Sequence, residues 1–200
     1  MKAMFKHKDL LLHSAAWNQC IVTGVYSTRL LYNELRGERT CVLWRNLIRG
    51  NRASPRAIFL LWMACQKRLQ TKDRLKKIGV ISDGNCLFCG DPESRDHLFF
   101  DCRITNQLWH QVLSWMKISH RPQGWHHELR WIISMANGKS NRAKLVRISI
   151  AEAIYHVWTV RNMKVFQPSN GGQLRLQEIK DRIIRRSQSD RKLLLFVNDL

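Results

Sequence analysis

Acidic residues are scarce in this chain of 200 residues. Fifteen aspartates and glutamates stand against 34 lysines and arginines, which gives a formal net charge of +19 and a sequence pI near 10.4. The few acids are not clustered, so the grouped carboxylates that two-metal catalysis requires are missing, and we expect that the protein is not an enzyme. A positive field of this size concentrates polyanions around a protein, and nucleic acid, RNA or DNA, is the partner that it favours.

Long apolar runs are lacking as well. No stretch approaches the roughly 18 apolar residues that cross a bilayer, and the start of the chain has no small-residue cleavage site of a secretory signal. We therefore expect an intracellular protein, nuclear or cytoplasmic, with no membrane partner. In a reducing compartment the six cysteines point to metal binding or buried thiols before disulfides. Cys20, Cys41 and Cys65 stand singly among apolar residues, so we interpret them as small core side chains.

Apolar residues at helical spacing predict a mostly α fold, with one short hairpin near the N-terminus that turns at Gly24. Ser27, Ser54 and Thr71 are expected to cap helices, and Gly37 and Gly79 to end them. The pattern divides the chain into an N-terminal segment (1–16), a small zinc-stapled helical domain (17–118) and a basic helical extension (125–200). Helices are predicted at 27–35, 41–48, 56–69, 72–78, from 105 onward, and at 125–136, 140–166 and 173–187.

The strongest motif is the spacing Cys86-x2-Cys89-x7-His97-x4-Cys102. Two cysteines that bracket two residues present both sulfurs to one ion from a tight turn, and the later His and Cys complete a tetrahedron of the CCHC type. Gly84 and Gly90 allow the backbone to bend around the metal. Because protein ligands fill all four positions, we predict one structural Zn²⁺ and no catalytic metal.

Further motifs accompany the four ligands along about half of the chain. They include Gly24-Val25-Tyr26-Ser27, Trp44-Arg45-Asn46-Leu47-Ile48, Ser54-Pro55-Arg56, Phe59-Leu60-Leu61-Trp62, Arg68-Leu69-Gln70-Thr71-Lys72-Asp73-Arg74-Leu75, Cys86-Leu87-Phe88-Cys89 and His97-Leu98-Phe99-Phe100-Asp101-Cys102. This combination resembles the reverse transcriptase zinc-binding domain of plant non-LTR (LINE-type) retrotransposons.

The resemblance implies a region downstream of a reverse transcriptase that helps to hold element RNA or target DNA. We do not expect polymerase activity from this chain, because its sequence contains no Tyr/Phe-x-Asp-Asp pair to bind the catalytic metals. We therefore expect a non-catalytic zinc-binding module that binds nucleic acid. Two alternatives stay open: a protein-interaction module, with a reverse transcriptase or another protein as its partner, and a non-functional transposon remnant.

Positive charge lies outside the zinc segment. From Asp83 to Cys102 five acids accompany a single arginine, so we do not expect the metal loop itself to bind phosphates. His126-His127-Glu128 lacks a partner histidine at helical spacing, and we interpret it as an exposed helix start and not as a second metal site. The candidate nucleic-acid contacts lie on the flanking helices; they are Lys67, Arg68, Lys72, Arg74, Lys76, Lys77, Arg182, Arg185 and Arg186.

Overall fold

The computed structural model describes residues 21–22, 25–36, 41–167, 169 and 172–200, and it separates into two compact units, Met1–Val42 and Leu43–Leu200. In the first unit β1 (Ile21–Val22) pairs antiparallel with β2 (Val25–Tyr26), and α4 (Thr28–Arg36) follows. The predicted hairpin is therefore present, and Ser27 Oγ accepts a hydrogen bond from Leu30 N at 3.4 Å, as expected of a cap. The predicted turn residue Gly24 and the predicted helix stop Gly37 lie outside the described residues.

The second unit is helical, and the predicted mostly α fold is confirmed. Its elements are α5 (Arg45–Ile48), α6 (Pro55–Cys65), α7 (Lys72–Lys77), a π-helical turn η1 (His97–Asp101), α8 (Arg103–Trp115), α9 (Trp125–Met135), α10 (Asn141–Phe166), α11 (Leu176–Ser187) and α12 (Arg191–Asn198). No helix among the described residues is both long and apolar enough to span a bilayer.

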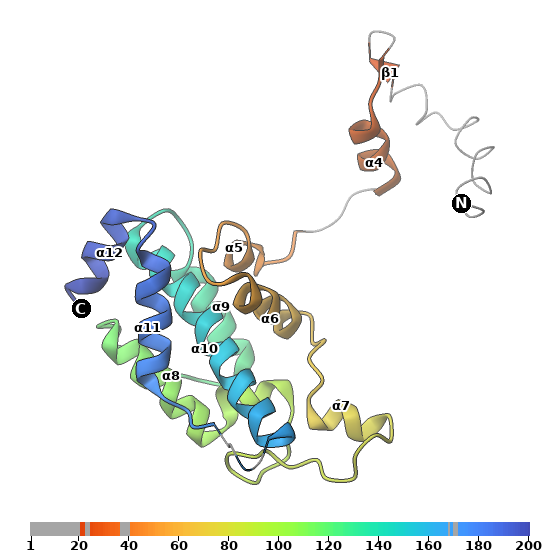
Figure 1. Ribbon diagram of the computed structural model, residues 1–200. Helices are drawn as coiled ribbons and strands as arrows, with labels where there is room; N and C mark the ends of the chain where they lie inside the picture. Colours follow the sequence, from red (N-terminus) through yellow and green to blue (C-terminus); the bar gives the residue numbers. More distant parts are fainter. Residues whose placement is uncertain (1–20, 23–24, 37–40, 168, 170–171) are drawn as a thin grey trace. The chain divides into compact units, whose positions relative to one another are not determined.

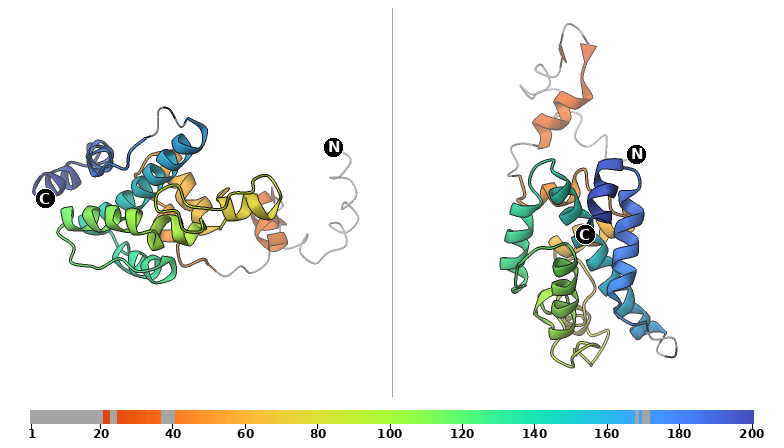
Figure 2. Two further views of the ribbon diagram at one scale, coloured as in Figure 1. Left: turned by 90° about the horizontal axis from the view of Figure 1, so that it is seen from below. Right: turned by 90° about the vertical axis from the view of Figure 1, so that its left-hand side faces the viewer.

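The long helix α10 is the centre of this unit. Ser140 caps it by accepting a hydrogen bond from Ala143 N at 3.1 Å. Most of its circumference is buried, because α6, α8, α9, α11 and α12 all pack against it (Figures 1 and 2). A helix that is covered on so many sides organises the core, so the position of every neighbouring helix depends on it.

One hydrophobic core runs through the second unit. Leu47 and Leu98, from the predicted zinc domain, belong to the same buried cluster as Ile183 and Leu193 from the predicted extension. The zinc segment and the basic helices therefore share their packing, and the metal centre is fixed against the helices that carry the positive charge.

Two local expectations, the cap at Thr71 and the burial of Cys41, are corrected. The Thr71 hydroxyl does not cap α7 but bonds to the Asp73 carboxylate, while Lys72 N donates to Glu93 Oε1 at 2.8 Å, so a distant residue caps this helix. Cys41 is exposed and not a core residue; Cys20 lies outside the described residues. Cys65 is partly buried, and burial raises the pKa of its thiol to about 12.

The helix α12 was not predicted from the sequence. Its N-cap, Asp190, accepts a hydrogen bond from Leu193 N at 3.2 Å. The same carboxylate pairs with Lys144 and Arg52, each at 2.8 Å. A helix of eight residues has little stability alone, so these contacts and the burial of Leu193 and Val197 hold it in place.

Candidate metal centre

Cys86 and Cys89 lie on a tight turn that local hydrogen bonds close. Cys86 N donates to Asp91 O at 2.7 Å, and Gly90 N donates back to Cys86 O at 2.9 Å. Gly90 has a φ of +87°, a conformation that other residues rarely adopt, so the predicted role of this glycine in bending the chain is confirmed. The turn brings both sulfurs to one side, as the x2 spacing predicts.

The other two ligand residues stand at the two ends of η1. His97 opens the turn, and Cys102 N donates to His97 O at 2.7 Å as the turn closes. Cys102 is also the N-cap residue of α8, so the metal centre leads directly into that helix. The π-helical turn was not predicted; it gives the four-residue gap between His97 and Cys102 the curvature that points both side chains at one centre.

The ligand atoms of Cys86, Cys89, His97 and Cys102 all lie within 4.8 Å of one another, and Cys89 Sγ is 3.1 Å from His97 Nε2. In a tetrahedral site with Zn–S bonds of about 2.3 Å, sulfurs lie roughly 3.7 Å apart, so the donor set fits zinc. Cys86 and Cys102 are buried, and Cys89 and His97 are half-buried. Four protein ligands leave no open position, and the protein therefore binds one structural zinc, as predicted.

Hydrogen bonding around Cys102 favours its thiolate. The Cys86 thiol is the largest influence, and the N–H groups of Thr105 and Ile104 at the start of α8 add to it; together they lower the pKa of Cys102 below its usual range. The same contact with Cys102, helped by burial, raises the pKa of Cys86. Zinc coordination deprotonates the remaining thiols.

A buried glutamate ties the metal loop to the rest of the fold. Glu93 lies between the two ligand pairs and is 1% exposed. It accepts from Arg161 of α10, Nη2 to Oε1 at 2.7 Å and Nε to Oε2 at 3.3 Å, and from Lys72 N of α7 at 2.8 Å. Because a buried carboxylate must be paired, these contacts fix the zinc loop, α7 and α10 relative to one another.

The structure separates the predicted nucleic-acid contacts into buried, half-buried and exposed groups. Lys72 is buried and its ammonium pairs with Asp83 at 2.6 Å, so it is withdrawn from the candidate set. Arg74 and Arg182 are half-buried; Arg74 Nη1 donates to Lys67 O, and the Arg182 guanidinium lies 4.8 Å from the Tyr155 ring centre. The exposed members are Lys67, Arg68, Lys76, Lys77, Arg185 and Arg186.

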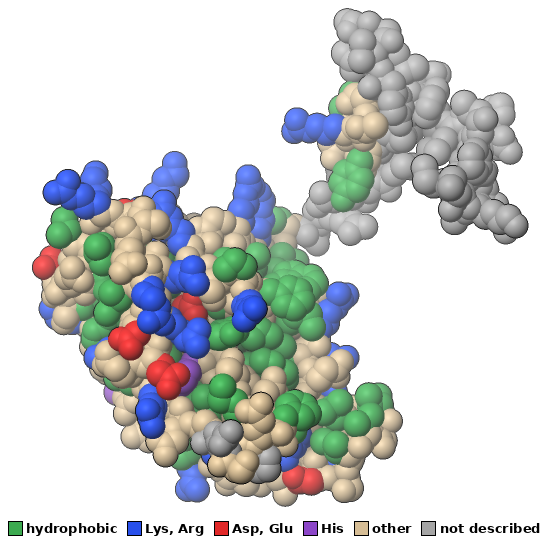
Figure 3. All heavy atoms as spheres, in the orientation of Figure 1, with side chains coloured by type: hydrophobic (Ala, Val, Ile, Leu, Met, Phe, Trp, Pro, Cys, Tyr) green, Lys and Arg blue, Asp and Glu red, His purple; other side chains and the backbone are tan. Residues whose placement is uncertain are grey.

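Basic side chains gather on one visible face of the second unit. Figure 3 shows many lysine and arginine side chains over the region of α10, α11 and α12, with some acidic side chains among them. The exposed members Arg185 and Arg186 belong to α11. These basic side chains, which the sequence placed on the flanks of the zinc segment, are thus exposed to solvent.

Sequence reasoning missed the role of Glu128. His126 and His127 are exposed, as an exposed helix start predicts, but Glu128 is fully buried. It accepts from Trp109 Nε1 at 2.7 Å and from Gln123 N at 3.1 Å, and it pairs with His120 Nε2 at 2.9 Å. Nothing in the motif reveals this burial, because the groups that satisfy the carboxylate come from other segments.

Comparison with known proteins agrees with the zinc geometry. No curated protein and no solved structure matches the chain. Residues 26–109, a range that includes all four ligands, match the family described as zinc-binding in reverse transcriptase. Over this range the chain is therefore similar to the zinc-binding domains of that family, and its Cys₃His cluster lies inside the matched range.

Proposed function

We propose that the protein is a non-catalytic, zinc-stapled module that binds nucleic acid through its phosphates. The observation that carries this proposal is the net charge of +19, together with the exposed lysines and arginines of the helices around the zinc segment. Phosphate contacts of this kind release counterions and give affinity with little sequence preference. The closed Cys₃His site supports the non-catalytic role, because it leaves the metal no position for water or substrate.

The family match supports an origin for the module. We infer that it derives from the region downstream of the reverse transcriptase of a plant LINE-type retrotransposon, where it would act on RNA or DNA inside the cell. The acidic metal loop acts as a scaffold in this proposal, since it holds α7 and α10 through Glu93 and carries few cations of its own.

The proposal is tested by fluorescence anisotropy with labelled single-stranded RNA and duplex DNA of equal length. If about six phosphates are engaged, the affinity should fall by roughly 10³ between about 50 and 200 mM salt. Binding that does not change with salt, or no binding to either polymer, would contradict the proposal and favour a protein-interaction module.

Two exposed cations from separate helices serve as the first variant. Lys77→Ala/Arg185→Ala removes side chains of α7 and α11 that have no ion pair in the described part of the chain. If both contact phosphate, affinity falls for every sequence and the salt slope drops by about 2. The control Lys77→Arg/Arg185→Lys keeps both charges and should bind like the wild type.

A further inference from the structure

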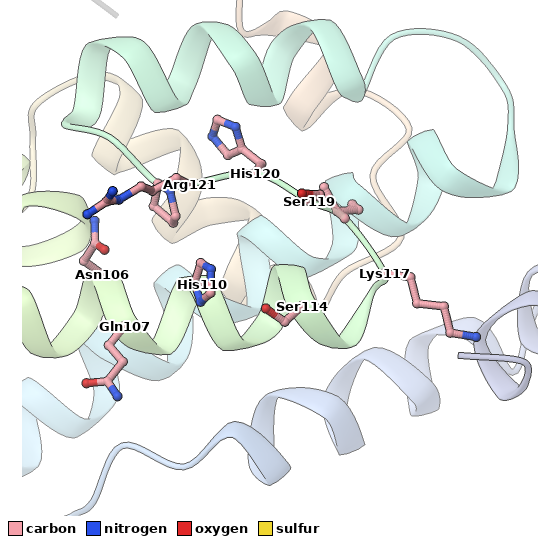
Figure 4. A pocket seen from close by; sticks show the side chains of 10 residues that line it. Asn106, Gln107, His110, Ser114, Lys117, Ser119, His120 and Arg121 are labelled. Carbon is pink, nitrogen blue, oxygen red and sulfur yellow. The ribbon is translucent and has the colours of Figure 1, made fainter.

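A groove lies beside α8 on the surface of the second unit. It has a volume of about 760 Å³, within the roughly 300–1,000 Å³ typical of ligand sites. Figure 4 shows its two walls: Asn106, Gln107 and His110 come from α8, and Ser119, His120 and Arg121 come from the segment that crosses beside it. None of the described residues that line the groove is acidic. Apart from Ile118 and Pro122, the lining residues are cationic or neutral and polar.

The crossing segment is held by the buried Glu128 carboxylate. Glu128 is 0% exposed and contacts α8 through Trp109 and the crossing segment through His120 and Gln123 N. The His120 ring also stacks on Trp131, with ring centres 3.7 Å apart and planes inclined by 2°. Both contacts restrain the imidazole, so this wall of the groove is preorganised and is not a loose surface loop.

The metal centre positions the opposite wall. α8 begins directly after the ligand Cys102, and Asn106 Nδ2 donates to Phe100 O of the π-helical turn at 2.7 Å. Zinc binding therefore fixes the first turns of α8, on which Asn106, Gln107 and His110 stand. The groove is coupled to the metal without using any metal ligand as a binding group.

The lining side chains offer hydrogen-bond donors to an anion. Arg121 and Gln107 are exposed and make no hydrogen bond or ion pair within the part of the chain that the structure describes. The Arg121 side chain extends toward Asn106 across the mouth of the groove (Figure 4). Lys117 stands at the rim, where its ammonium donates to Asp199 O at 2.8 Å. A planar guanidinium beside amide and imidazole groups is well suited to the oxygens of a phosphodiester.

We propose that this groove is a binding site for the sugar–phosphate backbone of nucleic acid, with Arg121, His110 and Gln107 as the contacting groups. The proposal rests on the proposed nucleic-acid function and adds its location, which differs from the helices that the sequence indicated. The contacts are made to phosphate and sugar, so RNA and DNA of any sequence are bound.

The test compares two double variants, each of which removes one histidine and one arginine side chain. His110→Ala/Arg121→Ala removes two side chains that line the groove. His127→Ala/Arg130→Ala removes one exposed histidine and one exposed arginine of α9 that do not line it. Loss of a charged hydrogen bond should weaken binding about tenfold, and the salt slope should fall by about 1 for Arg121. The α9 variant should bind within about twofold of the wild type, because its two side chains do not line the groove.

The outcomes separate the groove from the function. If the groove variant binds like the wild type while Lys77→Ala/Arg185→Ala binds more weakly, the assignment of the groove as the binding site is wrong and the proposed function stands. If the wild-type protein binds neither polymer, both are wrong. Zinc content and helical circular dichroism confirm folding of each variant. Arg121→Ala alone changes an exposed side chain and keeps the test available if the double variant does not fold.

Discussion

The buried pair of Glu93 and Arg161 gives the sharpest prediction about stability. The side chains are 0% and 3% exposed, and two hydrogen bonds join them, at 2.7 and 3.3 Å. In Arg161→Met the Glu93 carboxylate keeps only the N–H of Lys72 and loses its countercharge. An uncompensated buried charge costs about 3–5 kcal/mol. Since domains of this kind are stable by only about 5–15 kcal/mol, we expect a large loss.

The measurement is urea unfolding of the zinc-bound protein, followed by circular dichroism, with Arg52→Met as the matched control. Arg52 also pairs with an aspartate, Asp190 at 2.8 Å, but its side chain is 45% exposed, so its removal should cost only about 0–1 kcal/mol. Glu93→Gln/Arg161→Met removes both charges and should recover part of the loss. Equal losses for Arg161→Met and Arg52→Met would refute the assignment of Glu93 as the tie between the metal loop and α10.

Three further predictions follow from single residues. His97→Ala removes one of four ligands, so mass spectrometry should find zinc lost and circular dichroism should find reduced helix content; full zinc occupancy would contradict the assigned ligand set. Lys72→Met should lower stability, because Lys72 pairs with Asp83, but it should leave the salt slope of nucleic-acid binding unchanged; a slope reduced by about 1 would return Lys72 to the contacts. Burial lowers the folded-state pKa of His156 below 6.5, so the unfolded chain binds the extra proton. The free energy of unfolding should therefore fall as pH drops from above 6.5 toward the folded-state value, and His156→Gln should flatten that fall.

The local features of the fold were predictable because their causes lie close together in the sequence. Ser54 caps α6 by accepting from Ala57 N, and Pro55 occupies the first turn, as the Ser-Pro pair indicates. Gly79 follows α7 with a φ of +73°, as a helix stop requires. The same locality explains the metal centre, whose four ligands fall within one short segment and whose spacing fixes the turn.

The partners of buried charges were not predictable. Lys72 reads as one cation in a basic run, yet it is buried, and its N–H is held by Glu93, 21 positions away. Glu128 reads as part of an exposed helix start, yet it holds together α8, α9 and the segment between them. The polarity of a residue indicates that it needs a partner or water, but not which of the two it obtains.

The sequence by itself determined the zinc site and most of the helices. The Cys₃His spacing is sufficient for a zinc site, and the apolar periodicity is sufficient for most helices, because both depend on residues a few positions apart. Tertiary structure decided how the zinc site is connected to the rest of the fold. The contact between Glu93 and Arg161 spans 68 positions, and the groove beside α8 exists only because Glu128 and the metal turn hold its two walls. Such contacts depend on how helices pack around α10, and packing is a property of the whole core that no single segment encodes.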